Sequence, residues 1–219
     1  MANLLERVQG TTGALKVFPL PSAVLFPGTA LPLHLFEPRY RHMLADCLAS
    51  DKVMALAQLQ PGWEPDYQGR PPLKPICCAG VVAWHEGLPD GRSNIILQGV
   101  VRARILEELE QPVPYRMVRA QLLPDEGYEG PEDEALRRAL LDVAGKVSGE
   151  ASGALLEMAA HVRGGALADV VAAALVQDVE RRQELLAELD IPRRLRGVLE
   201  EVGELAARLG PSRPSGPLN

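Results

Sequence analysis

The sequence predicts a mixed α+β fold in which a β-rich first part is followed by a helical second part. Three observations support this prediction. Between Lys16 and Leu123, short runs of Val, Ile, Leu and Ala alternate with Pro and Gly, a composition typical of short strands joined by turns. After Pro124 these signals stop, and Ala, Leu, Glu and Arg dominate, all of them strong helix formers. Pro131 is followed by three acidic residues, which suits the start of a helix.

The β-rich part begins with a proline-rich segment. Short strands joined by tight loops are expected from Lys16 to Leu35, because proline removes a backbone donor and disfavours helix. The prolines of this segment are Pro19, Pro21, Pro27 and Pro32. One amphipathic helix is expected from Pro38 to Ala49, since proline suits a first turn and apolar residues follow at helical spacing. A strand is expected from Val53 to Gln60.

A long loop is predicted from Pro61 to Pro75, which is too rich in Pro and Gly for regular structure. The remaining strands are expected at Ile76–His85, Ser93–Gln98, Val101–Ile105 and Tyr115–Leu123. The first two form a hairpin across the turn signal Pro89-Asp90-Gly91. Trp84, near the end of its strand, is expected in the core or at its rim.

The helical part shows apolar stripes at helical spacing. One stripe runs from Leu167 to Leu175, and another continues through Leu185 to Leu189. Asp190 before Pro192 indicates that a new helix begins there. The last stripe extends to Leu209 and stops at Gly210-Pro211. We therefore expect a flexible N-terminus at 1–13, a β-rich subdomain at 14–125, a helical subdomain at 126–210 and a disordered tail at 211–219.

Composition and charge restrict the function. The 219 residues, 47% of them hydrophobic, can bury a real core. The formal net charge of -6, from 29 acidic and 23 basic residues, argues against nucleic acid because it repels a phosphate backbone. Only three cysteines occur, which favours a reducing compartment. No leader pattern and no run of roughly 20 apolar residues is present, so the sequence predicts a cytoplasmic protein that does not enter membranes.

Two ordered segments resemble a known family. The segment VFPLPSAVLFPGTALPLHLFEPRY, residues 17–40, is similar to the opening signature of the substrate-binding N-terminal domain of Lon proteases. The segment DGRSNIILQGVVRARI, residues 90–105, resembles the second block of that family, and Tyr115 follows in the expected Pro-Tyr context. The LFEPRY form is typical of stand-alone members that lack the ATPase and peptidase parts of Lon. The resemblance covers about residues 14–209.

This resemblance implies a PUA-like β-barrel subdomain with one intervening helix, followed by a C-terminal α-helical bundle. It also implies that the chain grips proteins or peptides without altering them. The motif residues are interpreted as structural, with the prolines as rigid crossings, Gly28 as a turn, and Glu37 and Arg39 as a local ion pair or cap. They are Phe18, Pro19, Leu20, Phe26, Pro27, Gly28, Pro32, Leu33, Phe36, Glu37, Arg39, Tyr40, Asp90, Gly91, Gly99, Arg102 and Tyr115.

Motifs for catalysis and for cofactors are absent from the sequence. The one Gly-Lys pair, Gly145-Lys146, is followed by Val147 and does not form a P-loop, and no G-x-S-x-G elbow exists. The four histidines show no metal-ligand spacing, and Cys77-Cys78 is not a C-x-x-C motif. The sequence therefore predicts a protein that is not an enzyme and has no catalytic residue, cofactor or metal site.

Partner binding is expected to depend on exposed apolar surface. Trp63 and Tyr67 in the long loop are the candidate anchors for unfolded or partner protein segments, with the groove between barrel and helices as a second candidate place. The same two residues could instead fold back on the barrel as a small cluster. An RNA-binding alternative would use a basic face formed by Arg102, Arg104, Arg116 and Arg119. A third alternative is a structural scaffold that dimerises through its helical end. The chain is expected to be a monomer or a weak homodimer.

Overall fold

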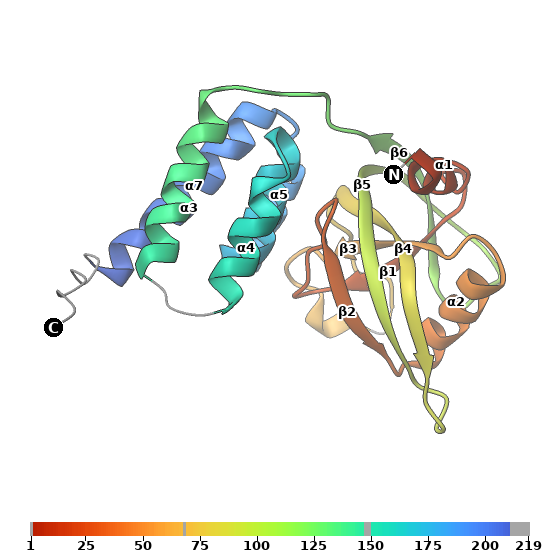
Figure 1. The fold of residues 1–219 in the computed structure, drawn as a ribbon. Helices are drawn as coiled ribbons and strands as arrows, with labels where there is room; N and C mark the ends of the chain where they lie inside the picture. The colour runs from red at the N-terminus through yellow and green to blue at the C-terminus, as the bar shows by residue number, and fades with distance from the viewer. Residues whose placement is uncertain (1, 68, 147–149, 211–219) are drawn as a thin grey trace, which may run out of the picture. The chain divides into compact units, whose positions relative to one another are not determined.

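The computed structural model describes residues 2–67, 69–146 and 150–210 (Figure 1). The chain forms two compact units, with the boundary between Pro124 and Asp125. The described part of the first unit contains a six-stranded sheet, and that of the second consists of helices and their connections, which confirms the predicted mixed α+β fold. The tail predicted at 211–219 lies outside the described residues.

The elements follow one another in the order that the sequence predicts, with additions. The first unit contains α1 (Ala2–Gln9), β1 (Leu15–Leu20), β2 (Ala30–Leu35), α2 (Pro38–Ala49), β3 (Val53–Gln58), the short 3-10 helix η1 (Glu64–Asp66), β4 (Ile76–Gly87), β5 (Ser93–Leu109) and β6 (Arg116–Leu123). The second unit contains α3 (Pro131–Lys146), α4 (Glu150–Ala160), α5 (Gly164–Leu175), α6 (Val179–Ala187) and α7 (Ile191–Leu209).

Five strands of the first unit close into a barrel. The strand order is β2-β5-β4-β3-β1-β6, and β5 pairs a second time with β6, which closes the circle β5-β4-β3-β1-β6. Strands β1 and β3 pair in parallel, with Val17 opposite Ala55, whereas the other pairs are antiparallel. Strand β2 pairs with the first half of β5 and extends the sheet beyond the barrel.

The barrel interior is filled by alternate residues of its five strands. Small side chains such as Ala55, Ala79 and Ala103 suit a barrel of few strands, whose interior is narrow. The buried interior cluster consists of Val8, Leu15, Val17, Val53, Ala55, Ala57, Cys77, Ala79, Val81, Val101, Ala103, Val118 and Ala120. Apart from Val8, these residues all lie on the barrel strands, so the period-two pattern of the sequence identifies the core.

One long strand replaces two predicted ones. The sequence predicts separate strands at Ser93–Gln98 and Val101–Ile105, but β5 runs without interruption from Ser93 to Leu109. A shift in register lies between the pairs Ala79–Val101 and Gly80–Gly99, so the strand continues through an irregularity instead of ending there. Gly99 is needed because a Cβ atom on it would lie 2.2 Å from the carbonyl oxygen of Phe26. The glycine therefore marks a close approach of two backbones and not a strand end.

The N-terminal segment is a correction to the sequence prediction. Residues 1–13 were expected to be flexible, but Ala2–Gln9 forms helix α1, and its Val8 is completely buried in the barrel cluster. An eight-residue helix has little stability of its own, so packing against the barrel accounts for its formation. The first unit thus contains α1 and η1 in addition to the one helix, α2, that was expected within the barrel.

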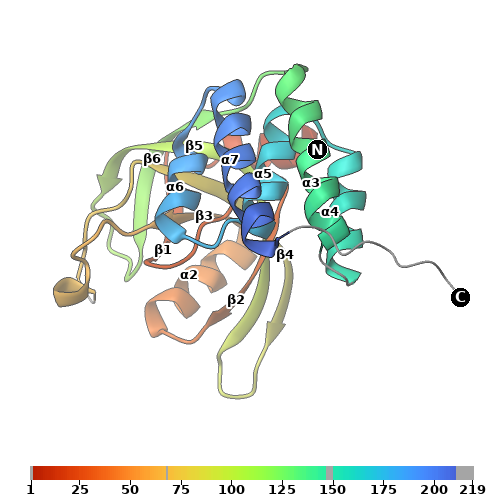
Figure 2. The same ribbon diagram turned by 90° about the vertical axis from the view of Figure 1, so that its left-hand side faces the viewer.

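The β4–β5 hairpin extends beyond the rest of the first unit (Figure 2). Its turn lies where the sequence predicts it. Gly91 has a positive φ of 81°, and the Asp90 carboxylate accepts a hydrogen bond from the Arg92 backbone N–H at 3.0 Å. The Leu88 N–H donates to the Arg92 carbonyl at 2.8 Å, which closes the turn.

The second unit packs α3 and α5 against the long helix α7. Leu195, Val198 and Val202 of α7 are fully buried, as the apolar stripe of the sequence predicts. Asp190 caps α7 by accepting a hydrogen bond from the Arg193 N–H at 2.8 Å, which confirms the predicted helix start. Of the helices in the part of the chain that the structure describes, none combines the length and apolar character needed to cross a membrane.

Candidate functional site

The long loop between β3 and β4 is closed at its base by backbone contacts. Leu59 and Leu73 form an isolated antiparallel bridge, and the Gln60 N–H donates to the Pro72 carbonyl at 2.8 Å. The Gln60 side chain also donates to the Leu73 carbonyl at 2.9 Å. These contacts fix the two ends of the loop, so its middle is presented as a defined excursion from the barrel.

The middle of this loop is bound to the motif at the start of α2. The Tyr67 hydroxyl donates to Glu37 Oε1 at 3.0 Å, and Arg39 Nε donates to Glu37 Oε2 at 3.0 Å. Arg39 Nη2 also donates to the Tyr67 carbonyl at 3.3 Å. The Arg39 guanidinium lies 4.7 Å from the ring centre of Tyr40 and 5.3 Å from that of Tyr67. The ion pair of Glu37 and Arg39 that the sequence predicts therefore exists, and it also holds the loop.

Trp63 completes this cluster of loop and motif residues. Its ring meets that of Tyr67 edge on, with centroids 5.4 Å apart, and both side chains are half-buried. The pKa of Tyr67 is raised, first by burial and then by its hydrogen bond to the Glu37 carboxylate. Tyr67 thus folds back onto the start of α2, and Trp63 lies against its ring, while part of each side chain remains exposed.

A second group of side chains lies on the outer face of β2, β5 and β4. The register places Pro32, Ile96 and Trp84 side by side across the three strands. All three are exposed, Trp84 to 48% and Ile96 to 36%. The neighbouring row is polar: His34 Nδ1 lies 2.7 Å from Asn94 Oδ1, and the Asn94 amide donates to Glu86 at 3.3 Å.

Phe36 extends this outer face beyond the end of β2. It is 58% exposed, and its ring stacks on His34 with centroids 6.1 Å apart. We define the outer-face patch as Pro32, Phe36, Trp84 and Ile96. Three members of the patch, Pro32, Trp84 and Ile96, lie side by side, unlike the single exposed apolar residues that any protein surface carries, whereas Phe36 lies beyond the polar row.

The exposure of Trp84 corrects the prediction that it lies in the core or at its rim. Strict alternation would put Trp84 on the same face as Val82, which is buried. A bulge at Ala83 breaks that alternation, because Val82 pairs with Leu97 whereas Trp84 pairs with Ile96. The bulge turns the tryptophan to the outer face, and no pattern in the sequence marks it.

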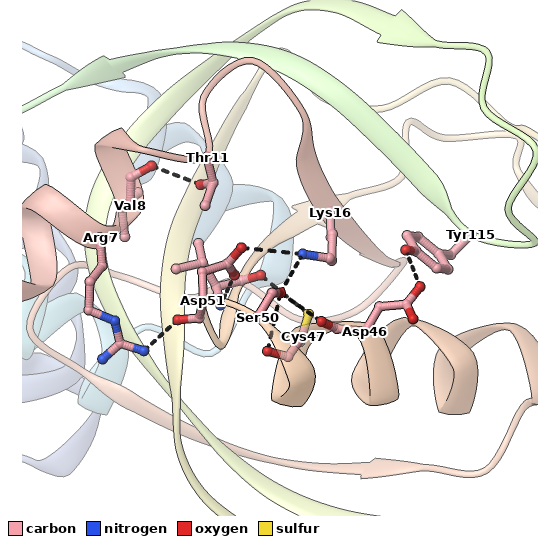
Figure 3. A network of polar contacts seen from close by, with 10 residues as sticks. Arg7, Val8, Thr11, Lys16, Asp46, Cys47, Ser50, Asp51 and Tyr115 are labelled. Atoms are coloured by element: carbon pink, nitrogen blue, oxygen red, sulfur yellow. Dashed lines mark hydrogen bonds and ion pairs between the residues drawn. The ribbon is translucent and has the colours of Figure 1, made fainter.

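Several other motif residues are buried or make backbone contacts in the barrel unit. Phe18 and Tyr40 are buried with ring centroids 4.5 Å apart, and Phe26 is fully buried. Gly28 has a φ of 76°, and its N–H donates to the Gly99 carbonyl at 2.9 Å. The buried Tyr115 donates its hydroxyl hydrogen to Asp46 at 2.6 Å (Figure 3).

The basic face required by the RNA-binding alternative does not form. Arg102 and Arg116 are only 1% and 7% exposed. Arg116 makes a bidentate ion pair with Glu108, with N–O distances of 2.8 and 2.6 Å. Arg119 pairs with Glu107 at 2.5 Å. Arg104 is exposed, but one exposed arginine beside two buried ones and a paired one is not a basic face.

Burial determines the protonation of two of the thiols. Burial raises the pKa of the Cys47 and Cys77 thiols to about 12, so neither is ionised near neutral pH. Among the described residues, no three His, Cys, Asp or Glu side chains converge to hold a metal ion.

These features define the class: a barrel of mixed strands followed by a helical unit, with apolar side chains on the barrel surface. Comparison with known proteins assigns the family. Residues 14–203 match the ATP-dependent protease La (LON) substrate-binding domain, and the chain belongs to this family.

Relatives and solved structures agree with this assignment. The chain is 27% identical over 91% of its length to Lon protease 1 of Syntrophobacter fumaroxidans and 30% identical over 85% of its length to Lon protease 2 of Myxococcus xanthus. It spans about a quarter of these relatives, 25% and 23% respectively.

The fold is also similar to two solved structures. The Lon N-terminal domain protein of Xanthomonas campestris gives a TM-score of 0.65 at 23% identity, covering 85% of this chain and 97% of that one. The N-terminal domain of Mycobacterium avium complex Lon protease gives 0.69 at 13% identity, covering 87% and 98%.

Proposed function

We propose that this chain is a non-catalytic recognition module that binds unfolded or partner polypeptide segments through apolar side chains and serves as an adaptor in protein quality control. Membership of the substrate-binding domain family supports a protein partner. We assign the binding surface to the outer-face patch, because Trp84, Ile96 and Pro32 lie in register there across three strands.

The physical argument is the release of water from this patch. Trp84, Ile96 and Phe36 each expose a third or more of their surface, and covering apolar surface is favourable at roughly 25 cal/mol per Å². Tryptophan is among the residues whose truncation most often costs a complex more than about 2 kcal/mol. The strands that carry Trp84 and Ile96 hold these side chains in fixed positions, which limits the entropy lost on binding.

The first experiment compares binding to one polypeptide in its unfolded and folded forms. A reduced and alkylated protein is the probe, and the same protein in its native state is the control. Combined replacement Trp84→Ser and Ile96→Ser is expected to weaken binding of the unfolded form at least tenfold, which corresponds to about 1.4 kcal/mol. Leu106→Ser is the matched control, since Leu106 is 54% exposed on the same strand β5 but lies outside the patch. Equal binding by the double variant and the wild type would refute the assignment.

The loop aromatics are the second part of the proposal. Trp63 and Tyr67 keep half-exposed rings next to each other, which suits the capture of an apolar or proline-containing side chain. Trp63→Ala with Tyr67→Ala is expected to weaken binding of the unfolded probe, whereas Tyr67→Phe keeps the ring and loses only the hydrogen bond to Glu37. If the affinity of the double alanine variant for the unfolded probe equals that of the wild type within error, the loop has no part in binding. The variants at Trp84 and Ile96 test the outer-face patch separately.

A further inference from the structure

Helix α1 covers one end of the barrel interior. Val8 is completely buried among the interior residues, and the partly buried Leu4 and Leu5 pack against the same cluster. The helix contacts β4 and β5 (Figure 1). The family match begins at residue 14, so α1 lies outside it. An apolar surface made by the family domain is therefore filled by a helix that precedes that domain.

This helix depends on its contacts and not on its own stability. Eight residues are too few for a stable isolated helix in water. The connection to β1 is also held by the barrel, because the Ala120 N–H of β6 donates to the Thr12 carbonyl at 2.9 Å. The Ala14 N–H also donates to the Thr11 carbonyl at 3.0 Å. The turn is bonded to α1 as well, because the N–H and hydroxyl of Thr11 donate to the Val8 carbonyl. Release of α1 therefore gives up these bonds, while the Ala120 N–H still holds the Thr12 carbonyl.

The turn that receives α1 is built without it. Asp51 Oδ1 accepts the Val53 N–H at 2.6 Å, and Asp51 Oδ2 lies 3.5 Å from the Lys16 ammonium (Figure 3). The Lys52 N–H donates to the Cys47 carbonyl at 2.8 Å, and Lys52 adopts a positive φ of 59°. These contacts fix the Asp51 carbonyl in position, and the Arg7 guanidinium of α1 donates to it.

The barrel end therefore has a defined chemical preference. It buries an apolar side chain at position 8 completely, packs apolar side chains at positions 4 and 5, and offers a carbonyl to a basic side chain at position 7. The Asp51 carboxylate of the same turn is paired with Lys16, so the preference for a basic side chain at position 7 rests on the Asp51 carbonyl. This is the pattern of a short amphipathic helix with a basic residue beside its apolar stripe.

We propose that this end of the barrel is a second polypeptide-binding site, that its ligand is an amphipathic helix with the pattern of α1, and that α1 occupies it until such a helix displaces it. The inference rests on the proposed function in that its ligand is also a polypeptide, but it uses a different surface from the outer-face patch. Binding of extended, unfolded segments and binding of short helices are then separate activities of one barrel.

The test uses the full chain with Val8→Asp, which removes the buried anchor of α1. The probe is a fluorescent synthetic peptide with the sequence of residues 2–13, followed by fluorescence anisotropy. The peptide is expected to bind the variant at least tenfold more tightly than it binds the wild-type chain, where α1 competes. The same peptide carrying Val8→Asp is the control and is expected not to bind. Equal binding of both peptides, or equal binding to both chains, would overturn the proposal.

Hydrogen exchange of the wild-type chain gives a second measurement that does not depend on folding of the variant. The amides of α1 are expected to exchange at least tenfold faster than those of β3 and β4, because α1 opens without barrel unfolding. Exchange of α1 only at the rate of the barrel would contradict a displaceable helix.

The oligomeric state is a further check. A wild-type dimer that Val8→Asp abolishes would assign the site to α1 of a second copy and overturn its assignment to another polypeptide. Trp84→Ser with Ile96→Ser should leave peptide binding unchanged, so the two proposals fail separately.

Discussion

At Gly99 the barrel has no room for a Cβ atom. A Cβ atom at this position would lie 2.2 Å from the Phe26 carbonyl oxygen and 3.1 Å from Cys78 Sγ. The Gly99 N–H donates to the Thr29 carbonyl at 2.8 Å, so two chain segments pass each other here at backbone distance. The sequence resemblance places this glycine in a motif, and the structure gives the physical reason.

Gly99→Ala is expected to destabilise the chain by roughly 1 to 3 kcal/mol or more, because the clash is with backbone and not with a flexible side chain. Urea unfolding measures the change. Gly87→Ala is the matched control on the neighbouring strand, since its added Cβ would meet only His85 Cε1 at 3.9 Å. The control should stay within about 0.5 kcal/mol of the wild type. A Gly99 variant as stable as the control would show that the two segments can separate without cost.

Cys77 makes the stability of the chain depend on alkaline pH. Burial raises its pKa from 9.0 to about 12, so the unfolded chain loses this proton more readily than the folded one. The stabilising contribution is complete below pH 9 and is lost as the pH rises towards 12. Between pH 8 and pH 10, the Cys77→Ala variant should therefore lose about 1 kcal/mol less stability than the wild type.

Urea unfolding at the two pH values checks this expectation. Cys47, whose pKa burial also raises to about 12, should behave in the same way when replaced by Ala. The double variant should show about twice the reduction. An unchanged pH dependence in all three variants would mean that the thiols are accessible to solvent in the folded chain.

At the scale of elements, the sequence locates most helices and strands. It does not locate the β-bulges and register shifts that determine which face of the sheet a side chain lies on. The starts of α2, α3 and α7 were predicted because Pro38, Pro131 and Asp190 act locally. The bulge at Ala83 and the register shift near Gly99 were not predicted, since both arise from pairing with distant residues. Helix α1 was missed because its stability comes from the barrel and not from its own eight residues.

Helices α5 and α7 are joined by a buried charge. Arg194 is fully buried, with one nitrogen 2.5 Å from Asp125 and another 3.7 Å from the buried Asp169. Arg194→Ala should destabilise the chain by roughly 3 to 5 kcal/mol, because it removes the cation that lies 3.7 Å from the buried Asp169 carboxylate. The double variant Arg194→Met with Asp169→Leu removes both charges and should cost less than Arg194→Ala alone. Chemical denaturation of the three chains measures this order, and the reverse order would show that packing of the arginine stem matters more than its charge.

At the scale of the whole molecule, the candidate surfaces combine residues that are far apart in the sequence. Glu37 meets Tyr67 across thirty positions, and Pro32 lies in register with Ile96 and through it with Trp84. The sequence identified Trp63 and Tyr67 because aromatic residues are rare in this chain. It could not identify the outer-face patch, because that patch depends on strand register, which no local pattern specifies.

The distribution of charge over the molecule leads to a prediction about nucleic acid. The formal net charge is -6, and of the four arginines considered for RNA binding two are buried and Arg119 is paired with Glu107. A backbone-binding protein needs several cations free to contact phosphates, with affinity that falls steeply with salt. Single-stranded RNA is therefore expected to show no salt-dependent retention by the chain in filter binding at low ionic strength. Retention that disappears at moderate salt and in the Arg104→Glu variant would contradict this expectation and favour an RNA-binding function over the polypeptide-binding one.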